Sequence, residues 1–278
     1  MHNAAIAALG LNWRYLAFDA HPDHLRAAIE GAKAMKFIGL NLTVPHKLLA
    51  LEMVDALDAS AESWGAVNTI RFEARDARGE WQPLARLPDE ASGEILARGF
   101  NTDADAIVRA LREDFDLQLL RGAGVLLLGA GGAGRVAGLK FAGEGVGSLF
   151  LVNRTMNKAE ALAAEIRRRF PRQEVSIGYP KTEVDLVINA TSLGLRSDDP
   201  PPFDERQFSL SQARHVYDMV YRPAETALLH AARAAGCRAA NGLSMLLYQG
   251  AAALEIWSGK PAPETVMRRA LEHNLYGT

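Results

Sequence analysis

The stretch VLLLGAGGAGR, residues 125–135, decides the fold prediction. Its first four residues are apolar, which is typical of a strand buried on both faces. Residues 129–134 satisfy the pattern G-x-G-x-x-G, and the residues after them have helical spacing. The glycine pattern alone is weak, but between a buried strand and a helix it predicts the phosphate-binding turn of a dinucleotide-binding unit.

Each glycine of this turn has a physical reason. Gly129 allows the tight turn, Gly131 lets the backbone approach a pyrophosphate, and Gly134 lets the helix and the strand pack closely. The free N–H groups at the start of the helix then face the phosphate charge. We therefore predict cofactor contacts along the whole turn, at Gly129, Ala130, Gly131, Gly132, Ala133 and Gly134.

The end of the next apolar run indicates which dinucleotide binds. A site selective for NAD places Asp or Glu there, to bind the ribose 2′-hydroxyl. This chain has Asn153, Arg154 and Thr155 at that point, and Lys158 follows. A carboxylate would repel a 2′-phosphate, whereas a guanidinium can bind it through two parallel hydrogen bonds. The sequence therefore predicts NADP as the cofactor.

The same alternation of strand and helix continues on both sides of the turn. Candidate strands are residues 125–128, 148–152, 174–177, 184–189, 215–219 and 237–240, and helical spacing lies between most of them. This alternation predicts a doubly wound parallel sheet.

The first hundred residues also alternate between helical and extended patterns. We expect helices at residues 4–9 and 23–36 and from Pro45 to about residue 57, and strands at 13–18, 37–42 and 65–72. Residues 73–98 are polar and contain several Gly and Pro residues, so we expect a long hairpin excursion on the surface.

Composition limits the class of protein. A chain of 278 residues that is 49% hydrophobic can form two domains, and its net charge of -2 gives no reason to expect a nucleic acid or a membrane as partner. The single cysteine, Cys237, cannot form an internal disulfide, and its apolar context predicts a buried thiol. No apolar run is long enough to span a membrane, and the first residues do not read as a secretory signal. We expect a cytoplasmic enzyme without a metal, either monomer or homodimer.

Six further segments resemble the signatures of the shikimate dehydrogenase family. They are NLTVPHK at residues 41–47, GAVNT at 65–69, NTD at 101–103, NATSLGL at 189–195, YDMVY at 217–221 and GLSMLLYQ at 242–249. The resemblance covers the whole chain in the right order. It implies two α/β domains on either side of an active-site cleft. Residues 1–101 would form the substrate domain, to which residues 245–278 return, and residues 102–244 would form the Rossmann-type NADP domain.

The chemistry of a ketone reduction points to two charged residues. The developing alkoxide needs a proton donor, and Lys47, just after a proline at a predicted helix start, is a candidate. Asp103 can hold that ammonium group in place and accept a hydrogen bond from a substrate hydroxyl. The resemblance implies the same catalytic pair.

A polyhydroxylated ring acid needs several neutral hydrogen-bonding groups, because a pocket that pairs hydroxyls rejects analogues without them. Thr43, Asn68, Tyr221 and Gln249 match the family's substrate positions. Met219 and Gly242 match positions that line the nicotinamide. The reaction implied is the reversible, NADPH-dependent reduction of 3-dehydroshikimate to shikimate in aromatic amino-acid biosynthesis.

The sequence departs from the family at three points, one of which is the long excursion at residues 73–98. The family has a first strand and a Ser-x-Ser loop, which binds the substrate carboxylate, just before the segment resembled here by residues 1–5. The printed sequence begins after that point, so we expect it to bind NADP normally and the substrate carboxylate poorly. Gly250 stands where the family usually has Ala after the Gln.

Two alternatives share most of these residues. A relative that acts on quinate or an aminoshikimate would differ only in details of the pocket around Thr43 and Tyr221. An NADP-binding protein without turnover, degenerate or truncated, would keep the glycine turn and lose the chemistry. Initial rates with shikimate and quinate separate all three.

Overall fold

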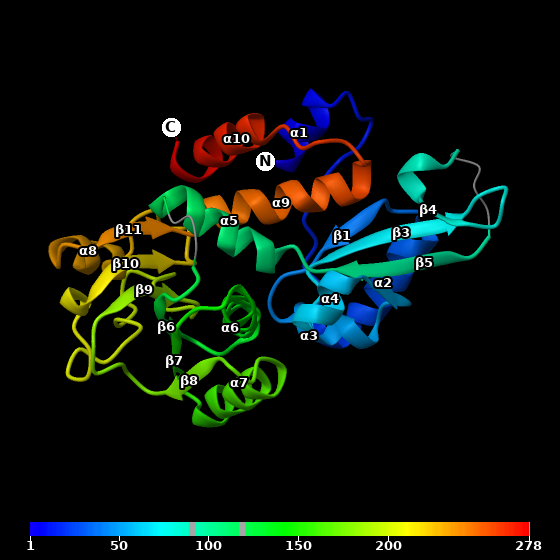
Figure 1. Ribbon diagram of the computed structural model, residues 1–278. Coiled ribbons are helices and arrows are strands. Elements are labelled where there is room, and N and C mark those ends of the chain that lie inside the picture. The colour runs from blue at the N-terminus through cyan, green and yellow to red at the C-terminus, as the bar shows by residue number, and fades with distance from the viewer. Residues whose placement is uncertain (89–92, 117–119, 278) are drawn as a thin grey trace. The chain divides into compact units, whose positions relative to one another are not determined.

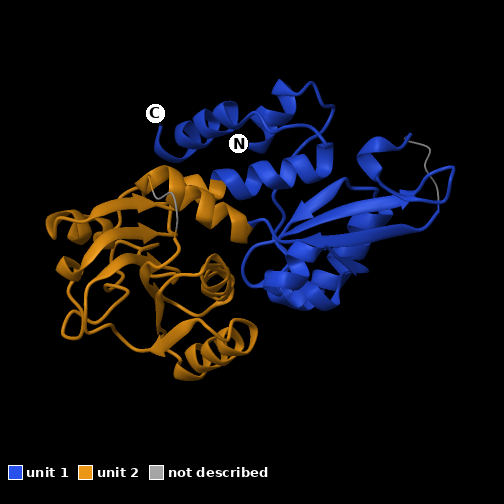
Figure 2. Ribbon diagram, in the orientation of Figure 1, with its two compact units in different colours: residues 1–102, 247–278 blue, residues 103–246 orange. Residues whose placement is uncertain are grey.

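The structure is a computed structural model that describes residues 1–88, 93–116 and 120–277. The chain divides into two compact units, shown in different colours in Figure 2. Unit 1 consists of Met1–Thr102 and Leu247–Thr278, and unit 2 of Asp103–Leu246. The chain therefore passes between the units twice, after Thr102 and within the long helix α9 (Leu243–Ser258).

Unit 2 is built on a parallel sheet with the strand order β11-β10-β9-β6-β7-β8 (Figure 1). Every pair in it is parallel. Its strands are β6 (Gly124–Leu128), β7 (Ser148–Val152), β8 (Glu174–Ile177), β9 (Val184–Asn189), β10 (Ala213–Asp218) and β11 (Arg238–Asn241). The order reverses between β6 and β9, which makes this a doubly wound sheet of the Rossmann type. The parallel sheet expected from the sequence is confirmed.

Helices cover both faces of the unit 2 sheet because its strands are apolar on both sides. On one face Leu126 of β6 packs with Leu228 and Ala232 of α8. On the other face, Leu127 of β6 lies near Gly138 of α6. The helices are α5 (Asp103–Phe115), α6 (Gly132–Glu144), α7 (Met156–Arg169) and α8 (Ala227–Ala234), with a 3₁₀ turn η4 (Leu210–Gln212). Cys237 is buried in the α8 layer, where its thiol donates to the Leu210 carbonyl over 3.1 Å, so the predicted buried thiol is confirmed.

Unit 1 contains a mostly antiparallel sheet with the order β1-β3-β5-β2, and β4 also pairs with β3. Its strands are β1 (Gly39–Asn41), β2 (Ala56–Leu57), β3 (Thr69–Arg75), β4 (Trp81–Pro83) and β5 (Ile95–Phe100). Its helices are α1 (His2–Ala8), α2 (Leu25–Ala34), α3 (His46–Leu49), α4 (Ala59–Trp64) and α10 (Glu264–Tyr276), with 3₁₀ turns η1 (Pro22–His24), η2 (Ala50–Glu52) and η3 (Leu84–Arg86). Most of α9 also belongs to this unit.

The two faces of the unit 1 sheet differ in chemistry. Ile70 and Phe72 of β3 are fully buried with Ile29 of α2, which makes one face the apolar core of the unit. Side chains alternate along a strand, so Arg71 and Glu73 point to the other face. There Trp257 of α9 donates its indole N–H to the Ile70 carbonyl over 2.9 Å.

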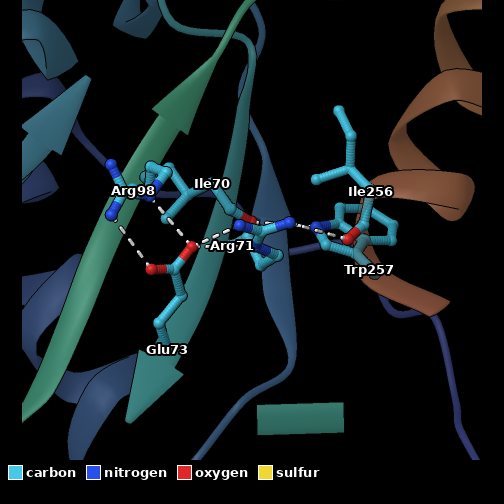
Figure 3. A network of polar contacts seen from close by, with 6 residues as sticks. All are labelled: Ile70, Arg71, Glu73, Arg98, Ile256 and Trp257. Atoms are coloured by element: carbon cyan, nitrogen blue, oxygen red, sulfur yellow. Dashed lines mark hydrogen bonds and ion pairs between the residues drawn. The ribbon is translucent and has the colours of Figure 1, made fainter. Parts of the chain in front are cut away.

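A charged triad occupies this second face (Figure 3). The side chain of Glu73 is only 2% exposed, and it accepts hydrogen bonds from both Arg71 and Arg98. Arg71 and Arg98 are register partners on β3 and β5, so without Glu73 two like charges would face each other. A buried carboxylate between two opposed guanidinium groups is the reason that this polar face can be covered at all.

The expected strand at residues 13–18 is wrong, because none of these residues is assigned to a strand. Leu16 and Phe18 are 65% and 67% exposed, so the aromatic pattern does not report a buried face. Instead, Tyr15 exchanges hydrogen bonds with the side chain of Asn3. Aromatic residues favour a strand only when a neighbouring strand offers hydrogen bonds and a surface to pack on.

Two further expectations in unit 1 need correction. The helix expected to run to about residue 57 is α3 and η2 only, and it gives way to strand β2, because Asp55 pairs with the backbone of Ala97 in β5. Residues 73–98, expected as a long hairpin excursion on the surface, do contain an antiparallel hairpin of β3 and β4, but Glu73 and Ala97 at their two ends are buried in the sheet. Residues 89–92 lie outside the described residues. Helix α4 was not expected.

Among the described residues, no helix is both long enough and apolar enough to span a membrane.

Candidate cofactor and substrate sites

The glycine turn joins β6 to α6 at the carboxyl end of the parallel sheet. Gly129 has a positive φ of 104°, which favours glycine. A Cβ added at Gly134 would overlap the Gly129 carbonyl oxygen, so only glycine lets the helix approach the strand. Nothing lies within 4 Å of a Cβ added at Gly131 or Gly132, and Gly131 is exposed. The turn therefore presents bare backbone to an open space.

Asn153 joins the glycine turn to the turn that follows β7. Its Oδ1 accepts from the Ala130 N–H over 2.9 Å, and its Nδ2 donates to the Thr155 carbonyl over 2.8 Å. Its side-chain amide thus fixes the position of both turns. The sequence predicted Asn153 as a cofactor residue, and the structure adds this supporting role.

Two cationic side chains lie next to this bridge. Arg154 is exposed, and so is Lys158 in the first turn of α7, whose N-cap residue is Thr155. Both cations are on the segment that Asn153 ties to the glycine turn, so a positive charge follows the phosphate-binding turn at a fixed place.

The chemistry of these residues suits a bound NADP. No side chain caps the first turn of α6, so in the described part of the chain its backbone N–H groups are available to a phosphate. Glycine and alanine line the space in front of the turn. The exposed guanidinium of Arg154 is on the segment that the Asn153 side chain links to that turn. The donor set that the structure presents is that of a site for a dinucleotide with an additional phosphate.

Met219 and Gly242 meet near the carboxyl end of the same sheet. A Cβ added at Gly242 would overlap the Met219 carbonyl oxygen, and the Gly242 N–H donates to the Val220 carbonyl over 3.2 Å. The structure thus brings together the two residues that the sequence assigned to the nicotinamide. Tyr221, two residues after Met219, is half-buried in the same unit.

A buried polar network supports these segments, and the sequence analysis assigned it no role. Asp218 at the end of β10 is fully buried and accepts from Asn189 at the end of β9 over 2.9 Å and from the Thr226 hydroxyl over 2.7 Å. Asn189 in turn accepts from the backbone and the hydroxyl of Thr191. One signal in the sequence marks both residues, since each is a polar residue that ends an apolar strand (VDLVIN and HVYD).

In unit 1, the segment of Thr43 and Lys47 lies against the segment of Asn68. The Leu42 N–H donates to the Asn68 carbonyl over 2.8 Å, and the Val67 N–H donates to the Lys47 carbonyl over 2.9 Å. Thr43 is exposed, whereas Lys47 is half-buried. The backbone therefore brings three of the predicted site residues together on one side of the unit.

The amide of Asn68 is held in one orientation. Its Nδ2 donates to the Thr102 hydroxyl over 2.8 Å, and its Oδ1 accepts from the Thr102 N–H over 2.9 Å. Asn68 is 1% exposed, so these bonds are shielded from water. Asp103, the next residue after Thr102, is 3% exposed at the first position of α5 in unit 2, where the helix dipole favours a negative charge.

Gln249 lies on α9, and the neighbouring backbone is anchored by an aromatic stack. His2 contacts the Gly250 carbonyl through its Nε2 over 3.1 Å and stacks on Tyr15 with ring centroids 4.2 Å apart. The Tyr15 hydroxyl donates to Asn41 over 3.1 Å, just before the Thr43 segment. A Cβ added at Gly250, where the family usually has alanine, would meet the end of the flexible Met1 side chain.

Family models and relatives match this chain over most of its length. The model for the shikimate dehydrogenase substrate binding domain matches residues 1–70, and those for shikimate/quinate 5-dehydrogenase and the shikimate 5′-dehydrogenase C-terminal domain match residues 112–194 and 242–272. Shikimate dehydrogenase (NADP(+)) of Methanopyrus kandleri is 41% identical over 98% of this chain and 90% of its own length. The Moorella thermoacetica protein of the same name is 41% identical over 99% and 88%.

A solved structure shows the same architecture. Shikimate 5-dehydrogenase from Thermus thermophilus, in complex with NADP(H) and shikimate, superimposes with a TM-score of 0.79 at 30% identity, covering 99% of this chain and 93% of that one. Among the described residues, no group of His, Cys, Asp or Glu is placed to hold a metal ion. With its glycine turn, its cationic strand end and this similarity along nearly its full length, the chain belongs to the shikimate dehydrogenase family.

Proposed function

We propose that this protein is an NADP-dependent shikimate dehydrogenase, which reversibly reduces 3-dehydroshikimate to shikimate for aromatic amino-acid biosynthesis. The observation that carries the proposal is the glycine turn between β6 and α6, linked through Asn153 to the exposed Arg154. It occurs in a chain that is similar over nearly its whole length to enzymes of that name.

Unit 2 would bind the cofactor. The N–H groups at the start of α6 would bind the pyrophosphate, and Arg154 with Lys158 would bind the 2′-phosphate. Met219 and Gly242 would contact the nicotinamide, which when bound supplies a hydride to the substrate. The residues around the turn have no acidic side chain at the end of β7, so nothing there repels the 2′-phosphate.

Lys47 and Asp103 would carry the chemistry on the substrate. Lys47 would donate the proton to the carbonyl oxygen in the reduction and accept it back in the oxidation. Asp103 would orient the Lys47 ammonium group and accept a hydrogen bond from a ring hydroxyl. Half-burial suits Lys47 to this task, because its carbon stem is covered while its head can reach a ligand.

Neutral polar groups would recognise the other hydroxyls. Thr43, Asn68, Tyr221 and Gln249 can each donate or accept a hydrogen bond. The fixed amide of Asn68 offers the clearest case, because its orientation is set before a ligand arrives. A site of this kind discriminates against analogues without the hydroxyl, since a buried polar group would be left unpaired.

The location and the oligomeric state are finer parts of the proposal. The ordinary charge balance and the single buried cysteine support a cytoplasmic protein, and we propose that it acts as a monomer or a homodimer. Size-exclusion chromatography with light scattering distinguishes a monomer from a homodimer.

Initial rates with two substrates and two cofactors test the function. We expect shikimate to be oxidised with NADP, at a kcat/KM at least about tenfold above that with NAD, because one charge-assisted hydrogen bond accounts for about that ratio. Quinate should be oxidised more slowly than shikimate. Faster turnover of quinate would favour the quinate alternative, and cofactor binding with no turnover of either substrate would favour a non-catalytic relative.

A further inference from the structure

Among the described residues, Asp218 is the only carboxylate at the carboxyl end of the unit 2 sheet that is fully buried. It ends β10, next to the point between β6 and β9 where the strand order reverses, and ligands of such sheets bind outside that point. The role proposed above for unit 2 leaves Asp218 without a function. A buried charge is costly, so its presence calls for a reason.

The groups around Asp218 all donate to it. Its Oδ1 accepts from the Asn189 amide over 2.9 Å and from the Val220 N–H over 3.0 Å, and its Oδ2 accepts from the Thr226 hydroxyl over 2.7 Å. The Thr226 hydroxyl itself accepts from the Leu229 N–H, which fixes its proton toward the carboxylate. Donors converging on both oxygens favour the ionised form over the acid.

This negative charge has no cationic partner in the described part of the chain. Asp218 is recorded there with three neutral donors and in no ion pair with a lysine or an arginine. Its field is therefore not cancelled locally, and burial keeps water from screening it.

The segments held by this carboxylate are those assigned to the nicotinamide. Its bond to Val220 spans Met219, which the Gly242 backbone contacts. Asn189 holds the turn that follows β9, through Thr191 and Leu193. Gly194, later in that turn, and Thr226 also line one cavity of about 380 Å³. The carboxylate is thus hydrogen-bonded to the segments that would face the nicotinamide.

We propose that Asp218 sets the redox preference of the cofactor site, because its uncancelled negative charge stabilises the oxidised nicotinamide, which is a cation, over the neutral reduced ring. This inference rests on the proposed function only for the identity of the cofactor. Two unit charges about 10 Å apart, at an effective dielectric constant of about 20, interact strongly enough to change an equilibrium constant by roughly tenfold.

The direct test compares the dissociation constants of NADP+ and NADPH, each measured without substrate by calorimetry, in the wild type and in Asp218→Asn. The substitution removes the charge and keeps the size of the side chain. NADP+ should bind roughly 5- to 10-fold more weakly to the variant, while the NADPH constant stays within about twofold. A purely structural role would weaken both cofactors by the same factor, so equal changes in the two constants, or none, would overturn the proposal.

Thr226→Val is the matched control. It removes one donor to the same carboxylate, at nearly the same volume, and leaves the charge in place. At neutral pH the ratio of the two constants should match that of the wild type, even if both constants shift together. A Thr226→Val ratio that changes as much as that of Asp218→Asn would assign the effect to packing and would also overturn the proposal.

A pH titration of the binding ratio covers the case in which Asp218→Asn does not fold. The pKa of Asp218 is raised above its ordinary value, because burial outweighs the three hydrogen bonds that lower it. As the pH falls through that pKa, the carboxyl becomes neutral and the NADP+ constant should rise relative to the NADPH constant. The 2′-phosphate titrates alike in both cofactors and cancels in the ratio.

Other charged or titratable groups near this carboxylate must be separated from it. They are Arg196, Asp199, Glu225 and His230 around the cavity, and Tyr217 in the same strand, which is titratable but neutral because burial raises its pKa. The Thr226→Val variant shows whether Asp218 causes the pH dependence of the binding ratio. Losing a donor to the ionised carboxylate raises the pKa of Asp218 alone, so the midpoint of the pH dependence should move to higher pH. A midpoint that does not move excludes Asp218. If the wild type binds neither cofactor, the proposed function fails; if it binds both and the ratio is unaffected by these changes, only this inference fails.

Discussion

We propose that Arg154, an exposed side chain, contributes most of the preference for NADP over NAD. Replacing Arg154 with Ala should raise the KM for NADP and leave that for NAD nearly unchanged, because only NADP has the 2′-phosphate. The loss of a charge-assisted pair is worth about 1.5–3 kcal/mol, or roughly 10- to 150-fold. Steady-state kinetics with both cofactors measures it. An exposed arginine elsewhere, Arg206, provides the control substitution, and equal losses with NADP and NAD would refute the assignment.

Lys47 carries the proposed proton transfer. Lys47→Ala should lower kcat by about 10²–10⁴, the usual contribution of a general acid or base, while the dissociation constant of NADPH stays unchanged. Asp103→Asn should lower kcat as well, because the lysine would lose its orienting partner. Near-normal turnover by Lys47→Ala would mean that another group donates the proton.

At the scale of residues, the sequence predicted the local geometry of the glycine turn but not the side chains that hold the turns in place. The glycine turn was predictable because its positive φ and its close approach to β6 leave only glycine. The supporting roles of Asn153 and Asp218 were not, because each depends on a partner in another strand or turn, Ala130 for Asn153 and Asn189 for Asp218. Spacing along a sequence says nothing about contacts of that kind.

The strand pair β3 and β5 depends on the charged triad of Glu73, Arg71 and Arg98. Glu73→Gln should destabilise unit 1 by about 3–5 kcal/mol, since it leaves two register-paired arginines facing each other without a counter-charge. Denaturant unfolding followed by circular dichroism measures the change. Glu80→Gln, at an exposed position of the same hairpin, should change the stability by less than about 0.5 kcal/mol.

A second arm tests whether the cost comes from the uncompensated arginines. Combining Glu73→Gln with Arg71→Met and Arg98→Met should recover much of the lost stability, because a covered apolar layer replaces the ion triad. If the triple variant is no more stable than Glu73→Gln alone, the triad does not act through charge compensation.

At the scale of elements, the parallel sheet of unit 2 was predictable and parts of unit 1 were not. The strand β6 is buried along nearly its whole length and its sequence is a continuous apolar run. The strand β3 instead carries charges toward a covered face, so Glu73 resembled a surface residue in the sequence. The strand predicted at residues 13–18 was wrong for the opposite reason, since these residues have side chains typical of a strand but no neighbouring strand to pair with.

The stability of unit 1 should depend on pH through His2. Burial lowers the pKa of His2 to about 4, although its contact with Gly250 acts in the other direction. An unfolded histidine titrates near 6.5, so between about 6.5 and 4 the unfolded chain binds more protons than the folded one. The contribution of neutral His2 to the free energy of unfolding is fully present above about pH 6.5. About 3 kcal/mol of it is lost as the pH falls toward 4.

Urea unfolding at a series of pH values, followed by circular dichroism, measures this dependence. His2→Phe keeps a ring that can stack on Tyr15 and has no proton to gain, so its stability should fall less over the same range. Identical pH profiles for the wild type and His2→Phe would exclude His2 as the cause.

The burial of Cys237 has a consequence for following the whole molecule. The chain has one cysteine, in unit 2, and four tryptophans, Trp13, Trp64, Trp81 and Trp257, all in unit 1. A thiol reagent can reach Cys237 only when the layer around α8 opens, whereas indole fluorescence changes when unit 1 does. The unmodified protein therefore contains a chemical reporter for one unit and an optical reporter for the other. A single denaturation series read both ways tells whether the two units unfold as one cooperative body or in sequence.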